Sequence, residues 1–179
     1  MRVDLFDFEL PQERIAVVPA SPRDSARMLH VGASGVGDRS IRDLVNILRP
    51  GDLLISNDTK VIPAQLFGTR PSRNDGNRVS IEATLHRDLG KDCWRAFVRP
   101  AKRLKTGDVV QFGEALCAEV TERDGAKATL QFDTGDLSFD DAIERVGVMP
   151  LPPYIARKRA AADEDKLNYQ TVFASEPGS

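Results

Sequence analysis

Four consecutive polar residues, Asn57, Asp58, Thr59 and Lys60, follow the apolar run "DLLIS". A carboxylate and an ammonium group can transfer protons, and the neighbouring amide and hydroxyl can hydrogen-bond a ligand. α/β proteins place ligand sites at the ends of strands, which favours a site at this position. The same residue types also build ordinary polar turns, so a turn and a ligand site both remain open at this point.

A basic tract lies in "WRAFVRPAKRLK", residues 94 to 105, and contains no acidic residue. The formal net charge of the chain is −2, so attraction for a polyanion must be local. Basic side chains beside Trp94 and Phe97 suit phosphate contacts next to an aromatic surface for a base. A charged strand edge that opposes aggregation is the alternative. The basic residues of the tract are Arg95, Arg99, Lys102, Arg103 and Lys105.

Other chemistries are poorly supported. Cys93 and Cys117 lack the CxxC spacing of a zinc site, and His30 and His86 have no ligand partner close in sequence, so no metal is expected. The motif "GASGVG" has the reverse of the dinucleotide-binding glycine spacing and is expected to be a flexible surface loop. No run approaches the ~18 apolar residues of a membrane span, and the protein is therefore expected to be cytoplasmic, with no membrane partner.

The elements around the polar turn predict an α/β domain. Residues 40–48 match a helix with Ser40 and Asp43 as a capping box, and Pro50 and Gly51 end it. The residues 52–56 then read as a buried strand, and 60–68 as a second extended run. We predict the first part of a large α/β domain over residues 1–70.

Alternating apolar residues predict a different architecture from about residue 78. Five short strands, separated by glycine-containing turns, are typical of a small β-barrel. A helix with Ser138 as its cap follows and ends at Gly147. The predicted fold is therefore a large α/β domain, incomplete here, with an inserted small antiparallel β-barrel domain over residues 71–137. The chain returns to the truncated large domain over residues 138–179.

The stretch "GVMPLPPYIARK", residues 147–158, has three prolines within four residues. A polyproline helix here would form a stiff apolar strip, with Leu151 and Tyr154 on one edge and Pro152 and Ile155 on another, able to line a groove. Its PxxP spacing is also the pattern of a peptide ligand, which leaves a displayed, mobile peptide as the alternative.

Six motifs in this order resemble one family, the S-adenosylmethionine:tRNA ribosyltransferase-isomerases of queuosine biosynthesis. The resemblance covers the whole chain, and the family's "PARL" is represented here with Gln65 in place of arginine. The motifs are "LFDFELP" (5–11), "PRDSARML" (22–29), "GDLLISNDTKVIPAQLFG" (51–68), "RPAKRLKTGD" (99–108), "GVMPLPPYI" (147–155) and "YQTVFA" (169–174).

The resemblance implies a tRNA-modifying transferase and isomerase. Such an enzyme moves the ribosyl moiety of S-adenosylmethionine, its co-substrate, onto 7-aminomethyl-7-deazaguanine at the tRNA wobble position. Epoxyqueuosine forms, and adenine and methionine are released. The family pattern continues beyond Ser179, so the chain resembles an N-terminal fragment whose isolated activity is expected to be absent.

Candidate roles follow within that resemblance. Asp58, Lys60, Tyr154 and Tyr169 are candidate catalytic residues. Asn57, Thr59, Gln170 and Thr171 are candidate substrate-binding residues. The basic residues Arg95, Arg99, Lys102, Arg103 and Lys105 are candidate tRNA contacts. Turn capping by Asp58, and helix packing of Tyr169, are the structural alternatives.

Two other function classes stay open at the level of sequence. One is a non-catalytic tRNA-binding module, which would bind tRNA in a salt-sensitive way without turnover. The other is the PxxP peptide ligand, which requires residues 147–158 to be exposed and mobile.

Overall fold

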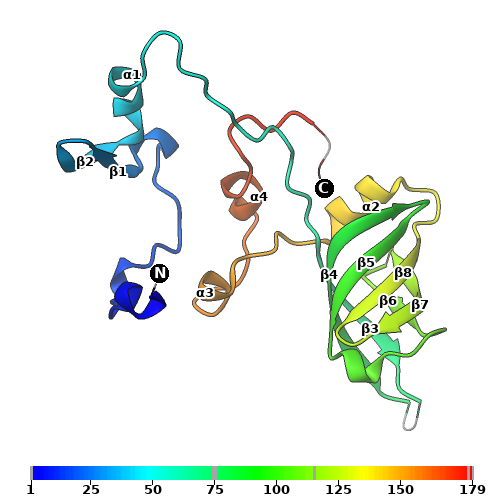
Figure 1. Ribbon diagram of the computed structural model, residues 1–179. Coiled ribbons are helices and arrows are strands. Elements are labelled where there is room, and N and C mark those ends of the chain that lie inside the picture. Colours follow the sequence, from blue (N-terminus) through cyan, green and yellow to red (C-terminus); the bar gives the residue numbers. More distant parts are fainter. Residues whose placement is uncertain (1, 74–75, 115, 177, 179) are drawn as a thin grey trace. The chain divides into compact units, whose positions relative to one another are not determined.

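The computed structural model describes residues 2–73, 76–114, 116–176 and 178. The chain divides into two compact units, Met1–Ile55 and Ser56–Ser179, which we describe separately (Figure 1). No helix in the described part of the chain is long and apolar enough to cross a membrane.

The first unit consists of short elements around a two-stranded antiparallel hairpin. Its apolar side chains remain at least partly exposed throughout residues 2–55. The elements are η1 (Val3–Phe6), η2 (Gln12–Arg14), η3 (Arg23–Ser25), β1 (Arg27–Gly32), β2 (Gly35–Ser40), η4 (Ile41–Asp43) and α1 (Leu44–Ile47).

The predicted capping box at Ser40 is present, with the Ser40 amide donating to Asp43 Oδ2 at 2.7 Å. The helix is shorter than predicted, because Leu48 is already extended and Pro50 disfavours helical backbone at the residue before it. The motif "GASGVG" is part of the β1–β2 hairpin, rather than a loop before a helix.

The buried strand predicted over residues 52–56 is not observed. Leu53, Leu54 and Ile55 have no strand partner in the described chain and are largely exposed. A strand in the interior of a sheet needs neighbours on both sides to satisfy its backbone groups. The large α/β domain is thus not seen in this chain, whereas the barrel is.

Six antiparallel strands form the closed barrel of the second unit, in the order β3-β4-β5-β8-β7-β6 (Figure 1). Thr69 pairs with Gln111 to close it. The strands are β3 (Gln65–Pro71), β4 (Arg78–Gly90), β5 (Cys93–Arg99), β6 (Val109–Gln111), β7 (Cys117–Asp124) and β8 (Lys127–Asp133), with η5 (Ala101–Arg103) between β5 and β6.

All five predicted barrel strands are confirmed, and β3 is a sixth. The sequence instead predicts residues 65–68 of β3 to be an extended run of the large domain. Period-2 alternation places one face of each strand inside, as in β5, where Trp94, Ala96 and Val98 are buried. The barrel interior therefore holds most of the hydrophobic core of the described chain.

Helix α2 (Phe139–Val146) packs against this core. The predicted cap is confirmed, since the Asp141 amide donates to Ser138 Oγ at 3.1 Å. Ala142 and Ile143 are buried, and the Phe139 ring stacks on Trp94 with centroids 5.3 Å apart. The helix thus covers one end of the barrel interior.

The proline-containing stretch after α2 is anchored to the barrel. Val148 exchanges backbone hydrogen bonds with Gln65, at 3.1 and 2.9 Å. The polyproline prediction is wrong from Pro153 onward, where the short helix α3 (Pro153–Ala156) begins with proline at its favoured first position. Tyr154 and Ile155 therefore lie on a helix, and α4 (Glu164–Asn168) follows.

Candidate functional site

The polar turn at residues 57–60 lies beside the segment that follows α4. Ser175 and Glu176 donate backbone hydrogen bonds to the Asp58 carbonyl, at 2.7 and 3.1 Å. Lys60 donates its amide to the Glu176 carbonyl at 3.0 Å. The structure thus brings together two of the segments in which the sequence predicts site residues.

Gln170 and Thr171 hold this arrangement with their side chains. The Gln170 amide donates from Nε2 to the Val61 carbonyl at 2.7 Å, and its Oε1 accepts from the Val61 N–H at 2.8 Å. Thr171 Oγ1 donates to the Asn57 carbonyl at 2.9 Å. Both side chains, predicted to bind substrate, therefore hydrogen-bond the chain's own backbone here.

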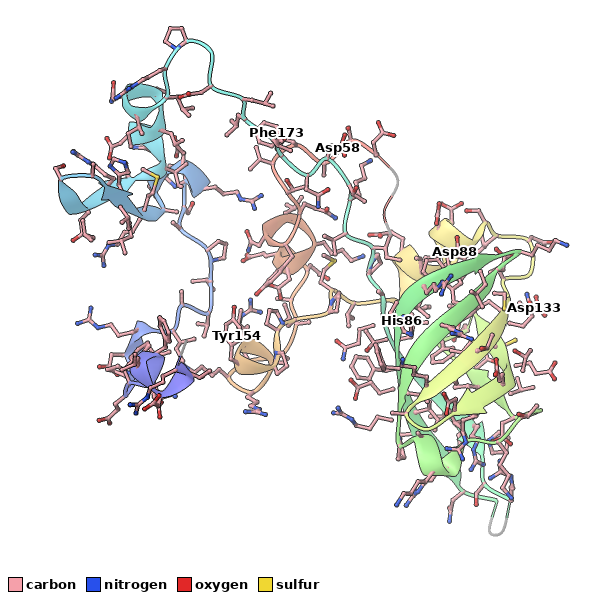
Figure 2. The ribbon with its side chains drawn as sticks, in the orientation of Figure 1. Asp58, His86, Asp88, Asp133, Tyr154 and Phe173 are labelled. Atoms are coloured by element: carbon pink, nitrogen blue, oxygen red, sulfur yellow. The ribbon has the colours of Figure 1, made fainter. Side chains whose placement is uncertain are left out.

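Asn57 and Thr59 form a local turn, in which the Thr59 amide donates to Asn57 Oδ1 at 3.0 Å. The side chain of Asp58 is exposed (Figure 2), and so is that of Lys60. Neither has an ion pair within the described part of the chain. These two charged groups are consequently available to a ligand.

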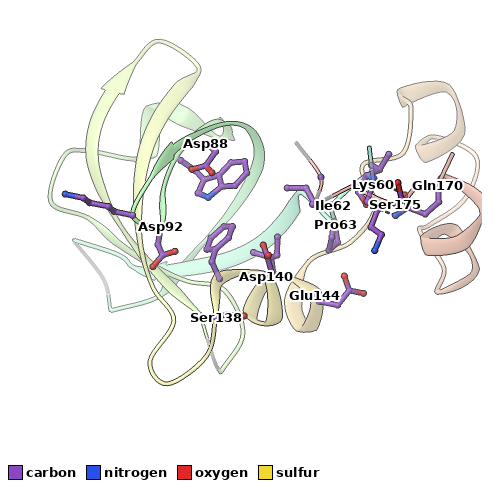
Figure 3. Close-up of a pocket in the computed structure, with 16 residues that line it drawn as sticks. Lys60, Ile62, Pro63, Asp88, Asp92, Ser138, Asp140, Glu144, Gln170 and Ser175 are labelled. Atoms are coloured by element: carbon purple, nitrogen blue, oxygen red, sulfur yellow. Dashed lines mark hydrogen bonds between the residues drawn. The ribbon is translucent and has the colours of Figure 1, made fainter. Parts of the chain in front are cut away.

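A cavity of about 660 Å³ lies between residues 60–63, α2 and the β4–β5 turn (Figure 3). Lys60 and Gln170 are the predicted site residues that line it. Its volume is in the range of small-molecule sites. The charged lining consists of Lys60 and Lys91 with the carboxylates Asp88, Asp92, Asp140 and Glu144.

The carboxylates of this cavity are not evident from the sequence because they come from separate elements. Asp88 belongs to β4, Asp92 to the turn after it, and Asp140 and Glu144 to α2. Glu144 forms an ion pair with Lys166, whose Nζ lies 2.7 Å from Glu144 Oε1. With Glu144 paired to Lys166, Asp88, Asp92 and Asp140 still outnumber the two ammonium groups, and the lining suits a ligand that carries positive charge and hydroxyl groups.

The two candidate catalytic tyrosines lie at the two short helices of the segment after α2. Tyr154 is half exposed on α3, and Tyr169 follows α4 (Figure 2). Burial, followed by the Asp165 charge, raises the pKa of Tyr169. Its hydroxyl therefore stays protonated at neutral pH and can donate a hydrogen bond, but is poorly suited to accept a proton.

Asp165 is the buried charge beside Tyr169, with 1% exposure. Arg159 holds both carboxylate oxygens, at 2.7 and 2.6 Å, and the Ala162 amide donates to Oδ2 at 2.8 Å. The Arg159 hydrogen bonds are the largest cause of the lowered pKa of Asp165. This pair fixes the short connection between α3 and α4.

The basic tract divides between two surfaces. Arg95 and Arg99 point outward from β5, whereas Lys102, Arg103 and Lys105 surround a basic cavity of about 500 Å³ at one end of the barrel. Arg70, Arg73 and Arg78 also line this cavity. Trp94 is buried in the core, so the expected aromatic neighbour of the tract is Phe97 alone.

Buried Arg70 organises the basic cavity. Its Nε donates to the Arg103 carbonyl at 2.9 Å, and Asp108 lies 3.4 Å from the same nitrogen. Asp108 also pairs with Arg73 and accepts from the Lys105 amide. Asp108 thus fixes two of the arginines without itself belonging to the described lining, whose cations suit phosphate.

Gln65 donates from Nε2 to Glu82 Oε1 at 2.7 Å. No group of three or more His, Cys, Asp or Glu in the described ranges is arranged to hold a metal ion. The buried Met149 and Ile155, with the pairing of Val148, disfavour a freely displayed PxxP peptide.

Comparison with known proteins gives a consistent family. Residues 3–179 match the model of the family described as "Queuosine biosynthesis protein". The S-adenosylmethionine:tRNA ribosyltransferase-isomerase of Maricaulis maris is 54% identical over 183 residues, covering 100% of this chain and 52% of the relative. The enzyme of the same name from Parvibaculum lavamentivorans is 52% identical, covering 100% of this chain and 51% of the relative.

The crystal structure of an S-adenosylmethionine tRNA ribosyltransferase from Thermotoga maritima also matches, with 35% identity and a TM-score of 0.34. The match covers 71% of this chain and 44% of that one. The chain spans about half the length of the curated relatives it matches.

Proposed function

The chain belongs to the queuosine biosynthesis family, and from that premise we propose that it forms part of an S-adenosylmethionine:tRNA ribosyltransferase-isomerase. The complete enzyme would transfer the ribosyl moiety of S-adenosylmethionine to 7-aminomethyl-7-deazaguanine at the tRNA wobble position. Epoxyqueuosine would form, with adenine and methionine released. We propose the cytoplasm as its location, because the enzyme would meet its tRNA substrate there.

The observation that carries this proposal is the family match over residues 3–179. Two relatives named as this enzyme are 54% and 52% identical in sequence to the whole chain, which supports the same assignment. The six motifs of the sequence fall within this match and are spread over several segments of the structure. The turn at 57–60 and the segment at 169–174 meet, while residues 99–108 belong to the barrel and its basic end.

The charge of the cavity beside Lys60 supports a site for S-adenosylmethionine. The sulfonium of this co-substrate is positive and acidifies the hydrogens on the adjacent ribose carbon, so the reaction requires a nearby base. The carboxylates of Asp88, Asp140 and Glu144 line the same cavity and complement a cation. Ribose hydroxyls can donate hydrogen bonds to the same oxygens.

Lys60 has the best support among the four candidate catalytic residues, because it lines the cavity and its ammonium has no ion pair within the described chain. Asp58 and Tyr154 are exposed, and we retain them as candidates. We propose that Tyr169 acts as a hydrogen-bond donor, since its pKa is raised. Asn57, Thr59, Gln170 and Thr171 would act chiefly by fixing the turn that presents Asp58 and Lys60.

The test uses residues 1–179 continued by the C-terminal part of the Maricaulis maris relative, alongside the 179-residue chain alone. Both are incubated with S-adenosylmethionine and tRNA carrying 7-aminomethyl-7-deazaguanine, and nucleosides are analysed by mass spectrometry. Epoxyqueuosine and adenine from the continued chain alone would support the proposal. Absence of product from the continued chain, under conditions where tRNA binds, would favour the non-catalytic tRNA-binding module.

The role of Lys60 is tested in the continued chain with Lys60→Gln. Lys91→Gln is a matched control, because both ammonium groups line the same cavity. Loss of a proton-transferring group is expected to lower kcat by roughly 100- to 10,000-fold, whereas the control retains most of its turnover. Equal losses in both variants would indicate that Lys60 contributes only to the charge of the cavity.

A further inference from the structure

The outer face of β5 presents an aromatic ring between two guanidinium groups. Because the strand alternates with period 2, burying Trp94, Ala96 and Val98 forces Arg95, Phe97 and Arg99 to the outside. Phe97 is 48% exposed. Phe67 of β3 is exposed as well, so exposure alone does not mark a site; the groups around the Phe97 ring distinguish it.

His86 of β4 brings a second ring to this face, at a register shift in the strand. Leu85 pairs with Ala96 and Arg87 pairs with Arg95, which leaves His86 as the extra residue between them. Leu85 is buried, whereas the imidazole of His86 lies outside, 4.5 Å from the Phe97 ring centroid at an interplanar angle of 33° (Figure 2). The alternation of β4 therefore turns His86 outward, and its ring pairs with that of Phe97.

A third cation covers the ring from the opposite strand. Lys127 of β8 pairs with Phe97, and its Nζ lies 5.6 Å from the ring centroid. Among the described residues, neither Arg95, Arg99 nor Lys127 has an ion pair. We refer to Arg95, Phe97, Arg99, His86 and Lys127 as the Phe97 platform.

Nearby acidic groups are partly engaged elsewhere. Glu82, which pairs with Arg99 across the strands, accepts from Gln65 at 2.7 Å. Glu122 lies 3.4 Å from the Thr129 hydroxyl, and Asp124 is the cross-strand partner of Lys127. Lys127 thus faces a carboxylate across the strands, but no ion pair ties up Arg95, Arg99 or Lys127 within the described chain, and the ring pair offers a flat apolar surface beside them.

We propose that the Phe97 platform is a contact surface for unpaired nucleotides of the tRNA substrate. One exposed nucleobase stacks on the Phe97 and His86 rings, and Arg95, Arg99 and Lys127 contact the flanking phosphates. Aromatic rings with interleaved cations are the usual means of holding single-stranded RNA, because every base has a stacking face and every linkage a charge. A paired duplex exposes no such face, so the surface selects unpaired regions.

This inference rests on the proposed function for its choice of RNA and adds the location and the mode of contact. It also assigns different tasks to the two halves of the basic tract. The cavity around Lys102, Arg103 and Lys105 has no aromatic side chain in its lining, as far as the described residues show, and suits phosphate alone. The platform, by contrast, combines stacking with charge.

The test measures binding of the 179-residue chain to an RNA stem–loop with 2-aminopurine among its unpaired nucleotides, and to a fully paired duplex of the same length. Phe97→Leu keeps an apolar side chain but removes the ring. We expect it to weaken stem–loop binding roughly 5- to 100-fold, leave duplex binding unchanged, and abolish quenching of the 2-aminopurine fluorescence. The binding constant falls as salt rises, and the slope of its logarithm against the logarithm of salt concentration reports the phosphates neutralised. Arg95→Gln is expected to reduce the magnitude of this slope by about 0.7, for the one phosphate that this side chain neutralises.

Phe67→Leu is the matched control, since Phe67 is exposed on β3 and has no ring or cation partner among the described residues. The fluorescence of Trp94, buried in the core, verifies that each variant is folded. Equal stem–loop affinities for the wild type, Phe97→Leu and Phe67→Leu would overturn the proposal. So would failure of the wild-type chain to bind the stem–loop, which would favour a protein as the partner of this face.

Turnover of the continued chain separates this inference from the proposed function. Suppose that the continued chain forms epoxyqueuosine and that its Phe97→Leu variant binds tRNA and turns over normally. The enzyme assignment then stands, and the proposed role of the Phe97 platform is wrong. If the continued chain forms no product but Phe97→Leu still weakens stem–loop binding, the platform stands without the enzyme assignment. A specific rise in KM for tRNA, with kcat unchanged, is the result expected when both are right.

Discussion

The barrel and residues 2–55 contain the same kinds of apolar side chain, but these are mostly buried in the barrel and at least partly exposed in residues 2–55. In the barrel, alternating residues such as Leu66, Ile81 and Val110 are fully or almost fully buried. In β1 and β2, the alternating Leu29, Val31 and Val36 are each about two-thirds exposed. Period-2 alternation is therefore present in both regions, and burial in only one.

The difference lies in closure. The barrel pairs each strand on both sides, and its closed sheet encloses its own apolar face. The β1–β2 hairpin has two strands and no layer packed on it among the described residues of its own unit. An isolated hairpin is at best marginally stable in water, so local pattern does not by itself produce a core. Stability in this chain is consequently expected to reside in the barrel.

Removing one phenylalanine ring from each region should give the largest contrast. Phe112 is fully buried, with its ring 6.1 Å from that of Phe132, and Phe8 is 72% exposed. Phe112→Ala is expected to lower the free energy of unfolding by about 3–5 kcal/mol, because it leaves a cavity. Phe8→Ala should stay within about 0.5 kcal/mol. Urea unfolding followed by circular dichroism measures the free energy of unfolding of each variant. Similar decreases in the two variants would contradict the expectation that stability resides in the barrel.

Adding one methyl group should give a smaller effect of opposite sign in the two regions. A Cβ at Gly147 would lie 2.1 Å from the Pro63 carbonyl oxygen and 2.6 Å from that of Ile143, both backbone atoms. A Cβ at Gly37 of β2 meets nothing within 4 Å among the described residues. Gly147→Ala should therefore destabilise by at least about 1–3 kcal/mol, whereas Gly37→Ala should stabilise by about 0.4–1 kcal/mol.

The thermal midpoints of the two glycine variants provide the measurement. If Gly147→Ala leaves the thermal midpoint unchanged, the backbone where α2 meets the segment before β3 can shift at little cost. The anchoring of residues 147–158 would then be weaker than the contacts indicate. Destabilisation by Gly37→Ala would mean that β2 has a packing partner on that face.

The sequence predicts the barrel well because the signal is local. Alternation and turn glycines identify five of its strands, and the cap identifies the helix after them. The role of β3 in the barrel is not predictable in this way, because its closure depends on Thr69 pairing with Gln111, far away in sequence. The strand expected at residues 52–56 fails for the same reason, since its apolar run specifies no partner.

The candidate site is predictable in its parts and not in its assembly. Residue types mark both the turn at 57–60 and the segment with Gln170 and Thr171, and the structure brings these segments together. The sequence does not show that the Gln170 side chain hydrogen-bonds the Val61 backbone. Nor does it show that the His86 ring meets that of Phe97, because this contact depends on the register of the neighbouring strand.

Ion pairs offer the smallest test of the comparison between a packed and an exposed region. Arg159 and Asp165 form a pair with a buried carboxylate, whereas Arg42 and Asp24 form one with both side chains 55% exposed. In each pair, the arginine is the largest cause of a lowered aspartate pKa. Water and salt screen the exposed pair, so it should contribute little.

The pKa of Asp165 lies below the value of about 3.9 for an unfolded aspartate, so the ionised carboxylate favours the folded state. Its contribution is complete above that unfolded value and is lost as the pH falls through the folded pKa. Asp165→Asn should therefore reduce amide-exchange protection at Tyr169, whose N–H bonds the Asp165 carbonyl, and flatten its acid dependence. Asp24→Asn should leave protection of the Ile41 amide nearly unchanged, and equal effects would show that burial does not distinguish the two pairs.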